Sequence, residues 1–206
     1  MRARLLLLAT LLAAACTTSV SGSRAMRSDQ LFGEELAGGQ FNALVGLRDF
    51  AASSTWQPLD EQLALGLDFV YGPRDALLQW DISVLYAFDD TSTALSGGAD
   101  RASAETWEVG LGMLHFFRFG SEAVVPYLGG GVSLLHVDTE LLAGGLVDDS
   151  DWSFGGYARA GMQFRFREYE HIGLDLRVLG GTDLDLAGGT THGDAIVLSL
   201  IFGNQF

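Results

Sequence analysis

The sequence predicts an all-β fold, an eight-stranded antiparallel up-and-down β-barrel that crosses a membrane. Apolar and polar residues alternate persistently from residue 40 onward, which is typical of strands with one apolar face. The connections between the expected strands alternate between short turns and long loops, as they do in transmembrane barrels. The composition agrees with a strand-rich chain, because the 206 residues include 27 glycines and 3 prolines.

The N-terminal segment resembles an export signal, so we exclude residues 1–15 from the fold. Two arginines precede an apolar run that is too short to span a bilayer as a helix. The stretch "AAAC" resembles a bacterial lipobox, with Ala13 where leucine is usual, so Cys16 is a candidate for lipidation. Ordinary cleavage, there or after Ala25, stays open. Residues 16–38 are rich in Ser, Thr and Gly and are expected to form a periplasmic tether.

The barrel domain is expected over residues 39–206. In chain order, the eight strands are predicted at 40–50, 60–71, 76–88, 104–117, 124–137, 152–166, 171–179 and 194–206. Most match the ~9–11 residues that a tilted strand needs to cross a bilayer. The short turns are expected at 72–75, 118–123 and 167–170, and the long loops at 51–59, 89–103, 138–151 and 180–193. An even strand number places both termini on the short-turn side, which we expect to be periplasmic.

Five of the expected strands are supported by the contrast between their two faces. One face carries Leu, Val, Ile, Met and aromatic residues. In chain order, the polar or small residues opposite them are Gln62, Ala64, Gly66 and Asp68; then Gln79, Asp81 and Ser83; then Glu108, Gly110 and Gly112; then Ser153, Tyr157, Arg159, Gln163 and Arg165; and last Asp175 and Arg177. Such alternation fits both a soluble barrel, with its apolar face inside, and a membrane barrel, with its apolar face outside.

Two features favour an apolar face that points outward to lipid. The polar face mixes glycines with charges of both signs, which suits a narrow lumen. Aromatic residues also gather near strand ends, while Leu, Val and Ile occupy the middles, as expected for two girdles at the bilayer interfaces. The expected girdles consist of Phe41, Tyr71, Phe117, Tyr127, Phe166 and Phe206 at the short-turn end, and of Phe50, Tyr86, Phe88, Trp107 and Phe154 at the long-loop end.

Three stretches carry a resemblance to a known family. They are "VPYLGGGVSL" at 125–134, "GLDLRVLGGTDLDL" at 173–186 and the terminal strand "AIVLSLIFGNQF". Together they resemble the small eight-stranded outer-membrane barrels of the OmpA/OmpW-like superfamily. The resemblance covers residues 38–206. It implies a location in the bacterial outer membrane, contact with outer-membrane lipids, and assembly by the barrel-assembly machinery with Phe206 in the assembly signal.

The charged residues of the polar face are expected to form a network inside the lumen. These residues are Asp68, Asp81, Glu108, Arg159, Arg165, Asp175 and Arg177. Side chains fill the interior of an eight-stranded barrel, so confined charges must pair. Arg159 is the expected partner of Asp175, and both Asp81 and Glu108 stay candidates for Arg177. We interpret the network as a structural plug, with a gated ion path as the alternative.

The remaining chemistry points away from catalysis. A net charge of −14 without any lysine disfavours nucleic-acid binding. No catalytic, cofactor or metal site is expected, and the acidic loops are interpreted as solvated rather than Ca²⁺-binding. The expected function is a structural or surface-interaction role, with the surface ligand unknown. The alternatives are a small channel or binder for an apolar or ionic solute, and a lipid-modifying enzyme using His136, Asp138 and Ser150.

Overall fold

The computed structural model describes residues 38–51, 61–73, 76–93, 100–118, 123–142, 146–167, 169–186 and 189–206. The expected signal segment, the tether and Cys16 lie outside these residues and stay predictions. No helix in the described part of the chain is long and apolar enough to cross a membrane.

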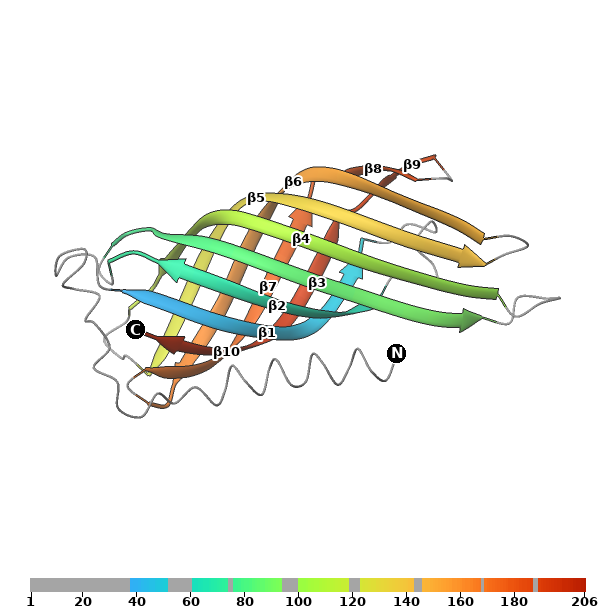
Figure 1. Cartoon of the computed structure of the whole chain (residues 1–206). Helices are drawn as coiled ribbons and strands as arrows, with labels where there is room; N and C mark the ends of the chain where they lie inside the picture. Colours follow the sequence, from blue (N-terminus) through green and yellow to red (C-terminus); the bar gives the residue numbers. More distant parts are fainter. Residues whose placement is uncertain are drawn as a thin grey trace, which may run out of the picture. The chain divides into compact units, whose positions relative to one another are not determined.

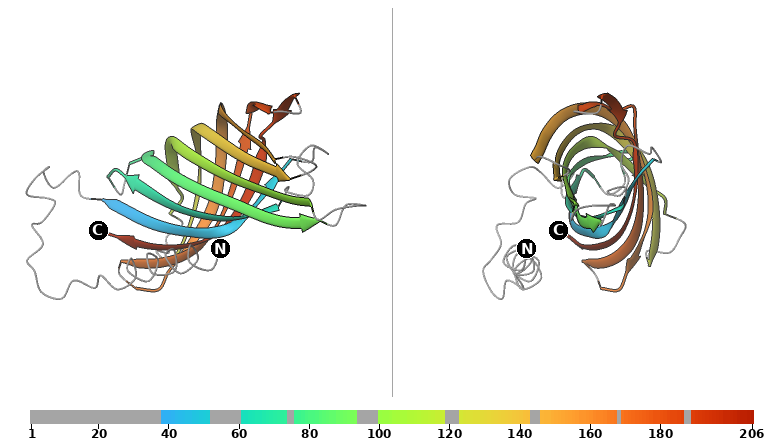
Figure 2. Two further views of the ribbon diagram at one scale, coloured as in Figure 1. Left: turned by 45° about the vertical axis from the view of Figure 1, so that its right-hand side comes forward. Right: turned by 90° about the vertical axis from the view of Figure 1, so that its right-hand side faces the viewer.

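Eight antiparallel strands close into a barrel, which confirms the predicted fold class (Figure 1). The strands of the barrel are β1 (Gly39–Phe50), β2 (Glu61–Tyr71), β3 (Gln79–Thr93), β4 (Asp100–Phe116), β5 (Val124–Leu142), β6 (Leu146–Arg165), β7 (Glu170–Gly180) and β10 (Ala195–Gln205). Seen from the end of the barrel that lies on the right in Figure 1, they form a closed ring (Figure 2).

The first and last strands join to complete the ring. β1 pairs with β2 on one side and with β10 on the other, in a register that sets Gln40 opposite Gln205 and Phe50 opposite Ala195. Within the closed part of the barrel every strand therefore has two neighbours. This closure satisfies the backbone hydrogen-bonding groups that a bilayer cannot satisfy.

Four neighbouring strands extend beyond the others at one end. β3 to β6 have 15, 17, 19 and 20 residues, compared with 11 or 12 in β1, β2, β7 and β10. We call the described parts of β3–β6 that lie between residues 89 and 105 and between 136 and 155 the wall. The loops expected at 89–103 and 138–151 are therefore wrong over most of their length. Cross-strand hydrogen bonds continue there, although the polar Thr, Ser and Asp residues resemble those of a loop.

The long loop expected at 180–193 contains a small hairpin. β8 (Asp183–Leu186) pairs with β9 (Gly189–His192) as a separate two-stranded sheet. Gly181, which leads from β7 into β8, has a φ of +75°, a left-handed conformation that glycine adopts without steric cost. Leu184 is fully buried, so the hairpin is packed onto the end of the barrel.

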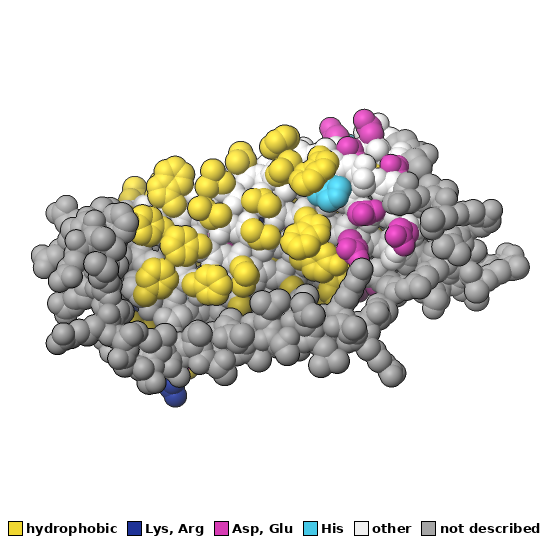
Figure 3. Space-filling view, in the orientation of Figure 1, with side chains coloured by type: hydrophobic (Ala, Val, Ile, Leu, Met, Phe, Trp, Pro, Cys, Tyr) yellow, Lys and Arg dark blue, Asp and Glu magenta, His cyan; other side chains and the backbone are white. Residues whose placement is uncertain are grey.

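The apolar face of the strands points outward, as predicted. In β7, Ile172, Leu174, Leu176 and Val178 are 45%, 50%, 42% and 44% exposed, whereas Asp175 and Arg177 are 2% exposed. Figure 3 shows apolar side chains over the closed part of the barrel, with acidic side chains gathered beyond them at the wall end. An apolar exterior of this extent indicates a surface that contacts lipid.

Two residues expected in the aromatic girdles face the lumen instead. Phe50 is 1% exposed and Tyr127 is 3% exposed. Phe50 is two residues from the inward-facing Arg48, and Tyr127 has the same parity as the inward-facing Ser133, so strand alternation places both inside. Phe41, Phe166, Phe206, Trp107 and Phe154 are exposed as expected, and Trp80, Trp152 and Tyr169 are exposed aromatic residues that the prediction did not include.

Candidate functional site

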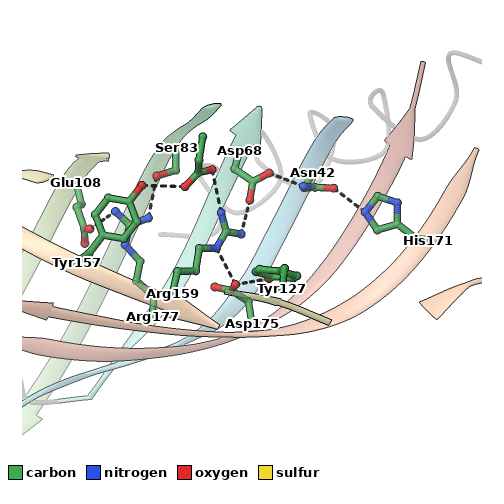
Figure 4. A network of polar contacts seen from close by, with 11 residues as sticks. Asn42, Asp68, Ser83, Glu108, Tyr127, Tyr157, Arg159, His171, Asp175 and Arg177 are labelled. Atoms are coloured by element: carbon green, nitrogen blue, oxygen red, sulfur yellow. Dashed lines mark hydrogen bonds and ion pairs between the residues drawn. The ribbon is translucent and has the colours of Figure 1, made fainter. Parts of the chain in front are cut away.

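Arg159 of β6 is the centre of the polar network inside the lumen (Figure 4). Its Nη1 lies 3.1 Å from Asp81 of β3, and its Nε lies 2.7 Å from Asp175 of β7. Its Nη2 contacts Asp68 of β2. One guanidinium thus connects carboxylates from three strands. The planar, always charged guanidinium has donors enough to satisfy all three at once.

A second ion cluster is built around Glu108 of β4. Arg48 Nη2 lies 2.9 Å from Glu108 Oε2, and Arg177 Nη2 lies 2.7 Å from Oε1. The second contact is an ion pair by distance and lacks the alignment of a hydrogen bond. Ser133 donates a hydrogen bond of 2.9 Å to Glu108, and Arg177 Nη1 donates one of 2.8 Å to Ser83. Of the two acids considered for Arg177, Glu108 is the one in contact.

Tyrosines and one amide connect these clusters to their surroundings. Tyr157 donates a hydrogen bond of 2.8 Å to Asp81 and also packs its ring 3.7 Å from the guanidinium of Arg177. Tyr127 donates to Asp175. Asn42 donates its side-chain N–H to Asp68 and accepts at Oδ1, 2.8 Å away, from Nε2 of His171 (Figure 4). Every one of these side chains is buried.

Glycines provide the space that the large inward side chains occupy. A Cβ atom at Gly161 of β6 would overlap the phenol ring of Tyr127, and a Cβ at Gly112 of β4 would overlap the hydroxyl of Tyr157. At Gly110 a Cβ would lie 2.6 Å from the hydroxyl oxygen of Ser83. These strand glycines are therefore required by close packing inside the lumen, not by a turn.

Apolar layers enclose the network along the lumen. On the short-turn side, a cluster contains Leu44, Val70, Leu114, Tyr127 and Ile201. On the wall side, a cluster contains Phe50, Leu135, Val137, Tyr157, Leu179, Leu184 and Ala195. Between them, a cavity of about 10 Å³ lies beside Arg159 and Arg177. That is about the space for one water molecule, so the side chains of the described residues fill the lumen at the level of the network.

Solved structures with the same architecture are small outer-membrane barrels. The chain matches Neisserial surface protein A over 82% of its own length and 94% of that chain, with 15% identity and a TM-score of 0.52. It matches the attachment invasion locus protein Ail of Yersinia pestis, in complex with the heparin analogue sucrose octasulfate, over 83% and 100%, with 13% identity and a TM-score of 0.57. The N-terminal β-barrel domain of Pseudomonas aeruginosa OprF gives 83% and 98%, 13% identity and a TM-score of 0.51.

The fold is that of a small outer-membrane barrel. No protein-family model and no curated protein matches the chain.

Six of the seven lumen residues predicted from the sequence lie in the network just described. The seventh, Arg165, lies at the short-turn mouth of the lumen and lines a different pocket. Arg48 is a network residue that the prediction missed. Its parity with Asn42 on the same strand places it inside, and a comparison of the two faces of residues 40–50 would have identified it.

The three residues considered for a lipid-modifying enzyme share the outer face of the wall. His136 and Asp138 are both on β5 with the same parity, and Ser150 on β6 lies opposite Asp138. However, the ring of His136 stacks on Trp152 at 4.3 Å, and its Nδ1 contacts the backbone oxygen of Asp151 at 3.1 Å. Among the hydrogen bonds of the described residues, none joins His136 to Ser150, so a nucleophile–base pair is not formed.

The acidic residues of the wall end make local contacts. Asp151 accepts a hydrogen bond of 2.7 Å from the backbone N–H of Asp185 in β8, and Asp183 lies 2.8 Å from His192 in β9. The N–H groups of Asp185 and Trp152 hold the pKa of the Asp151 carboxyl below its ordinary value. In the described part of the chain, no three His, Cys, Asp or Glu residues are arranged to bind a metal ion.

Proposed function

We propose that this chain is an integral protein of a bacterial outer membrane with a structural and surface-interaction role. The observation that carries the proposal is the combination of a filled lumen with a wall that extends beyond the apolar belt. The filled lumen disfavours transport, and the wall provides a surface for contact. We further propose that the wall faces the cell exterior and that both termini are periplasmic.

A partner of the wall is expected to carry positive charge. Its outer face presents Glu105, Asp138 and Glu140, and acidic side chains gather at this end in Figure 3. The Ail structure holds sucrose octasulfate, which is polyanionic. The acidic wall of this chain would repel such a ligand, so the shared fold does not imply a shared ligand.

The role of the wall is tested by shortening it. Val137 and Asp151 are opposite each other on β5 and β6, so residues 138–150 can be replaced by a two-residue Asn-Gly turn that suits a tight hairpin. We expect the shortened protein to reach the membrane and fold. Cells that display it should no longer bind the positively charged partner expected for the wall. In a second variant, Glu105, Asp138 and Glu140 are each changed to Gln. This variant keeps the length of the wall and removes its negative charge, so it shows which of the two binding requires. Unchanged binding by both variants would contradict a surface role for the wall.

The lipid-modifying alternative rests on the common face of His136, Asp138 and Ser150. It is tested by mass spectrometry of lipid A from cells that express the protein or the Ser150→Ala variant. We expect identical lipid A spectra from both. A mass change that requires Ser150 would establish the enzyme and overturn the non-catalytic proposal.

A further inference from the structure

The short-turn mouth of the lumen contains a pocket that the buried network does not use. The pocket measures about 20 Å³. Its polar side chains are Gln40, Gln79, Gln205, Arg118 and Arg165, which come from five different segments of the barrel. A shallow pocket of this size admits the oxygens of a ligand head group, and the rest of the ligand would stay outside.

The charged residues among the described lining of this pocket are opposite in sign to the net charge of the whole protein. The chain has a formal net charge of −14, and acidic residues face outward at the wall end. Among the residues that the structure describes, those that line the pocket include two arginines and three glutamines, and none of them carries a carboxylate. Arg118 and Arg165 therefore bring two positively charged groups to one mouth of an acidic barrel.

One buried donor in the pocket has no acceptor. Gln40 is only 5% exposed, and its Oε1 accepts a hydrogen bond of 3.1 Å from Nε2 of Gln205. The Nε2 of Gln40 has no hydrogen-bond partner among the described residues. By contrast, Nε2 of Gln79 donates to the backbone oxygen of Pro73 at 2.9 Å. A buried N–H without a partner favours a ligand that brings an acceptor.

We propose that this mouth binds the oxyanion head of a ligand, a carboxylate or a phosphate group. Such groups are negatively charged, offer several acceptor oxygens, and pair with arginine in a bidentate manner. Gln40 would donate to one oxygen while Arg118 and Arg165 provide the charge. The inference does not depend on the proposed function, because it uses the opposite end of the barrel from the wall.

The test uses the full barrel refolded in a non-ionic detergent, with acetate and inorganic phosphate as separate probes. We expect one of the two to shift the side-chain amide resonances of Gln40 in a saturable way. The probe that binds more tightly identifies the head group. No saturable shift with either probe would overturn the proposal, and a shift that vanishes on modest addition of chloride would show an adventitious ion only and would overturn it too.

Charge-neutral variants determine whether the arginines form the site. Arg118→Gln, at an exposed position, should weaken binding about tenfold, the effect of losing one charge-assisted hydrogen bond. The Arg118→Gln and Arg165→Gln double variant should abolish binding. The matched control is Arg167→Gln, which removes an exposed arginine that is paired with Glu170 at 3.2 Å and does not line the pocket. An equal loss in the control would indicate general surface charge and contradict the site.

Because Arg165 is partly buried, its variant requires a folding check by heat-dependent gel mobility. If the double variant does not fold, Arg118→Gln alone decides the question, since its side chain is exposed and is not needed for closure of the barrel.

Discussion

Leu176 and Arg177 are adjacent in β7 and lie in opposite environments. Leu176 is exposed on the lipid-facing side, whereas Arg177 is buried between Glu108, Ser83 and Tyr157. Removing Arg177 leaves Glu108 with Arg48 as its remaining cation. The change also removes the hydrogen bond to Ser83 and the contact with the ring of Tyr157, and it leaves a cavity in the lumen. Because Glu108 keeps one counter-ion, we expect a cost below the ~3–5 kcal/mol of a buried pair whose remaining charge has no partner.

Arg177→Ala is therefore expected to lower the free energy of unfolding clearly more than Leu176→Ala, whose lost contacts lipid or detergent replaces. The measurement is a urea unfolding series of both variants in the same bilayer or detergent. A larger loss in Leu176→Ala would mean that the outward face is a packed protein core.

At the residue scale, the odd or even position of a residue along its strand predicts whether its side chain faces the lumen or the exterior. It correctly placed Asp175 and Arg177 inside, and the same rule would have placed Arg48, Phe50 and Tyr127 inside. The last two were assigned by residue type, because aromatic side chains near strand ends suggest a girdle. Partners across the lumen, such as Glu108 for Arg177, depend on strand tilt and register, which no single strand reveals.

At the scale of elements, the β8–β9 hairpin depends on few contacts. Leu184 is its buried apolar anchor, and Asp151 of β6 accepts the backbone N–H of Asp185. The pKa of Asp151 in the folded protein is below its ordinary value. This contact therefore stabilises the hairpin fully at pH values above the pKa that Asp151 has in the unfolded chain. The stabilisation is lost as the pH falls through the lower pKa that Asp151 has in the folded protein.

We expect the amide proton resonance of Asp185 to titrate together with Asp151, at a midpoint below 3.8, the ordinary pKa of an aspartate. Nuclear magnetic resonance in detergent micelles measures it, and Asp151→Asn should remove the titration. A resonance that is independent of pH in the unchanged protein would show that this hydrogen bond does not hold the hairpin.

Phe206 follows the last strand and packs its ring 6.0 Å from that of Phe69 while it remains largely exposed. One exposed ring adds little to the finished barrel, so Phe206→Ala is expected to lower the amount of protein in the outer membrane more than its stability. Quantitative blots of membrane fractions measure the amount, and unfolding of the refolded variant measures the stability. Normal membrane levels with reduced stability would indicate an anchor instead of an assembly signal.

The sequence did not reveal how far β3–β6 extend beyond the other strands to form the wall. Beyond the apolar belt the outward face of a strand is polar as well, so the alternation between apolar and polar residues weakens. Residues such as Thr139, Asp149 and Ser150 then resemble a loop, although they pair across β5 and β6. The number of barrel strands and their order were predictable, because the lipid-facing segments keep the alternation.

At the scale of the whole molecule, closure predicts resistance to detergent. Each strand of the ring is hydrogen-bonded on both sides, so the folded barrel should migrate differently from the boiled chain in a dodecyl sulfate gel. Circular dichroism of the unboiled sample should show β-structure. Identical mobility before and after boiling would contradict a closed barrel.

The filled lumen predicts the absence of large conductance. Apolar layers lie on both sides of the ion network, and the cavity between them holds about one water molecule. We expect no steady open-channel steps from the purified protein in planar bilayers. Reproducible large steps would require the network to rearrange and would support the channel alternative.

The barrel closes only when β1 pairs with β10. This pairing joins residues as distant as Gln40 and Gln205, so the first strand must wait for almost the whole chain before it meets its second neighbour. Contacts of such long sequence separation form slowly, because a large loop must close first. During that delay the strand edges of β1 and β7 and the apolar exterior are open to other chains. An incomplete barrel therefore has an unpaired strand edge on each side. To reach the membrane without aggregating, it must be kept apart from other copies of the same chain.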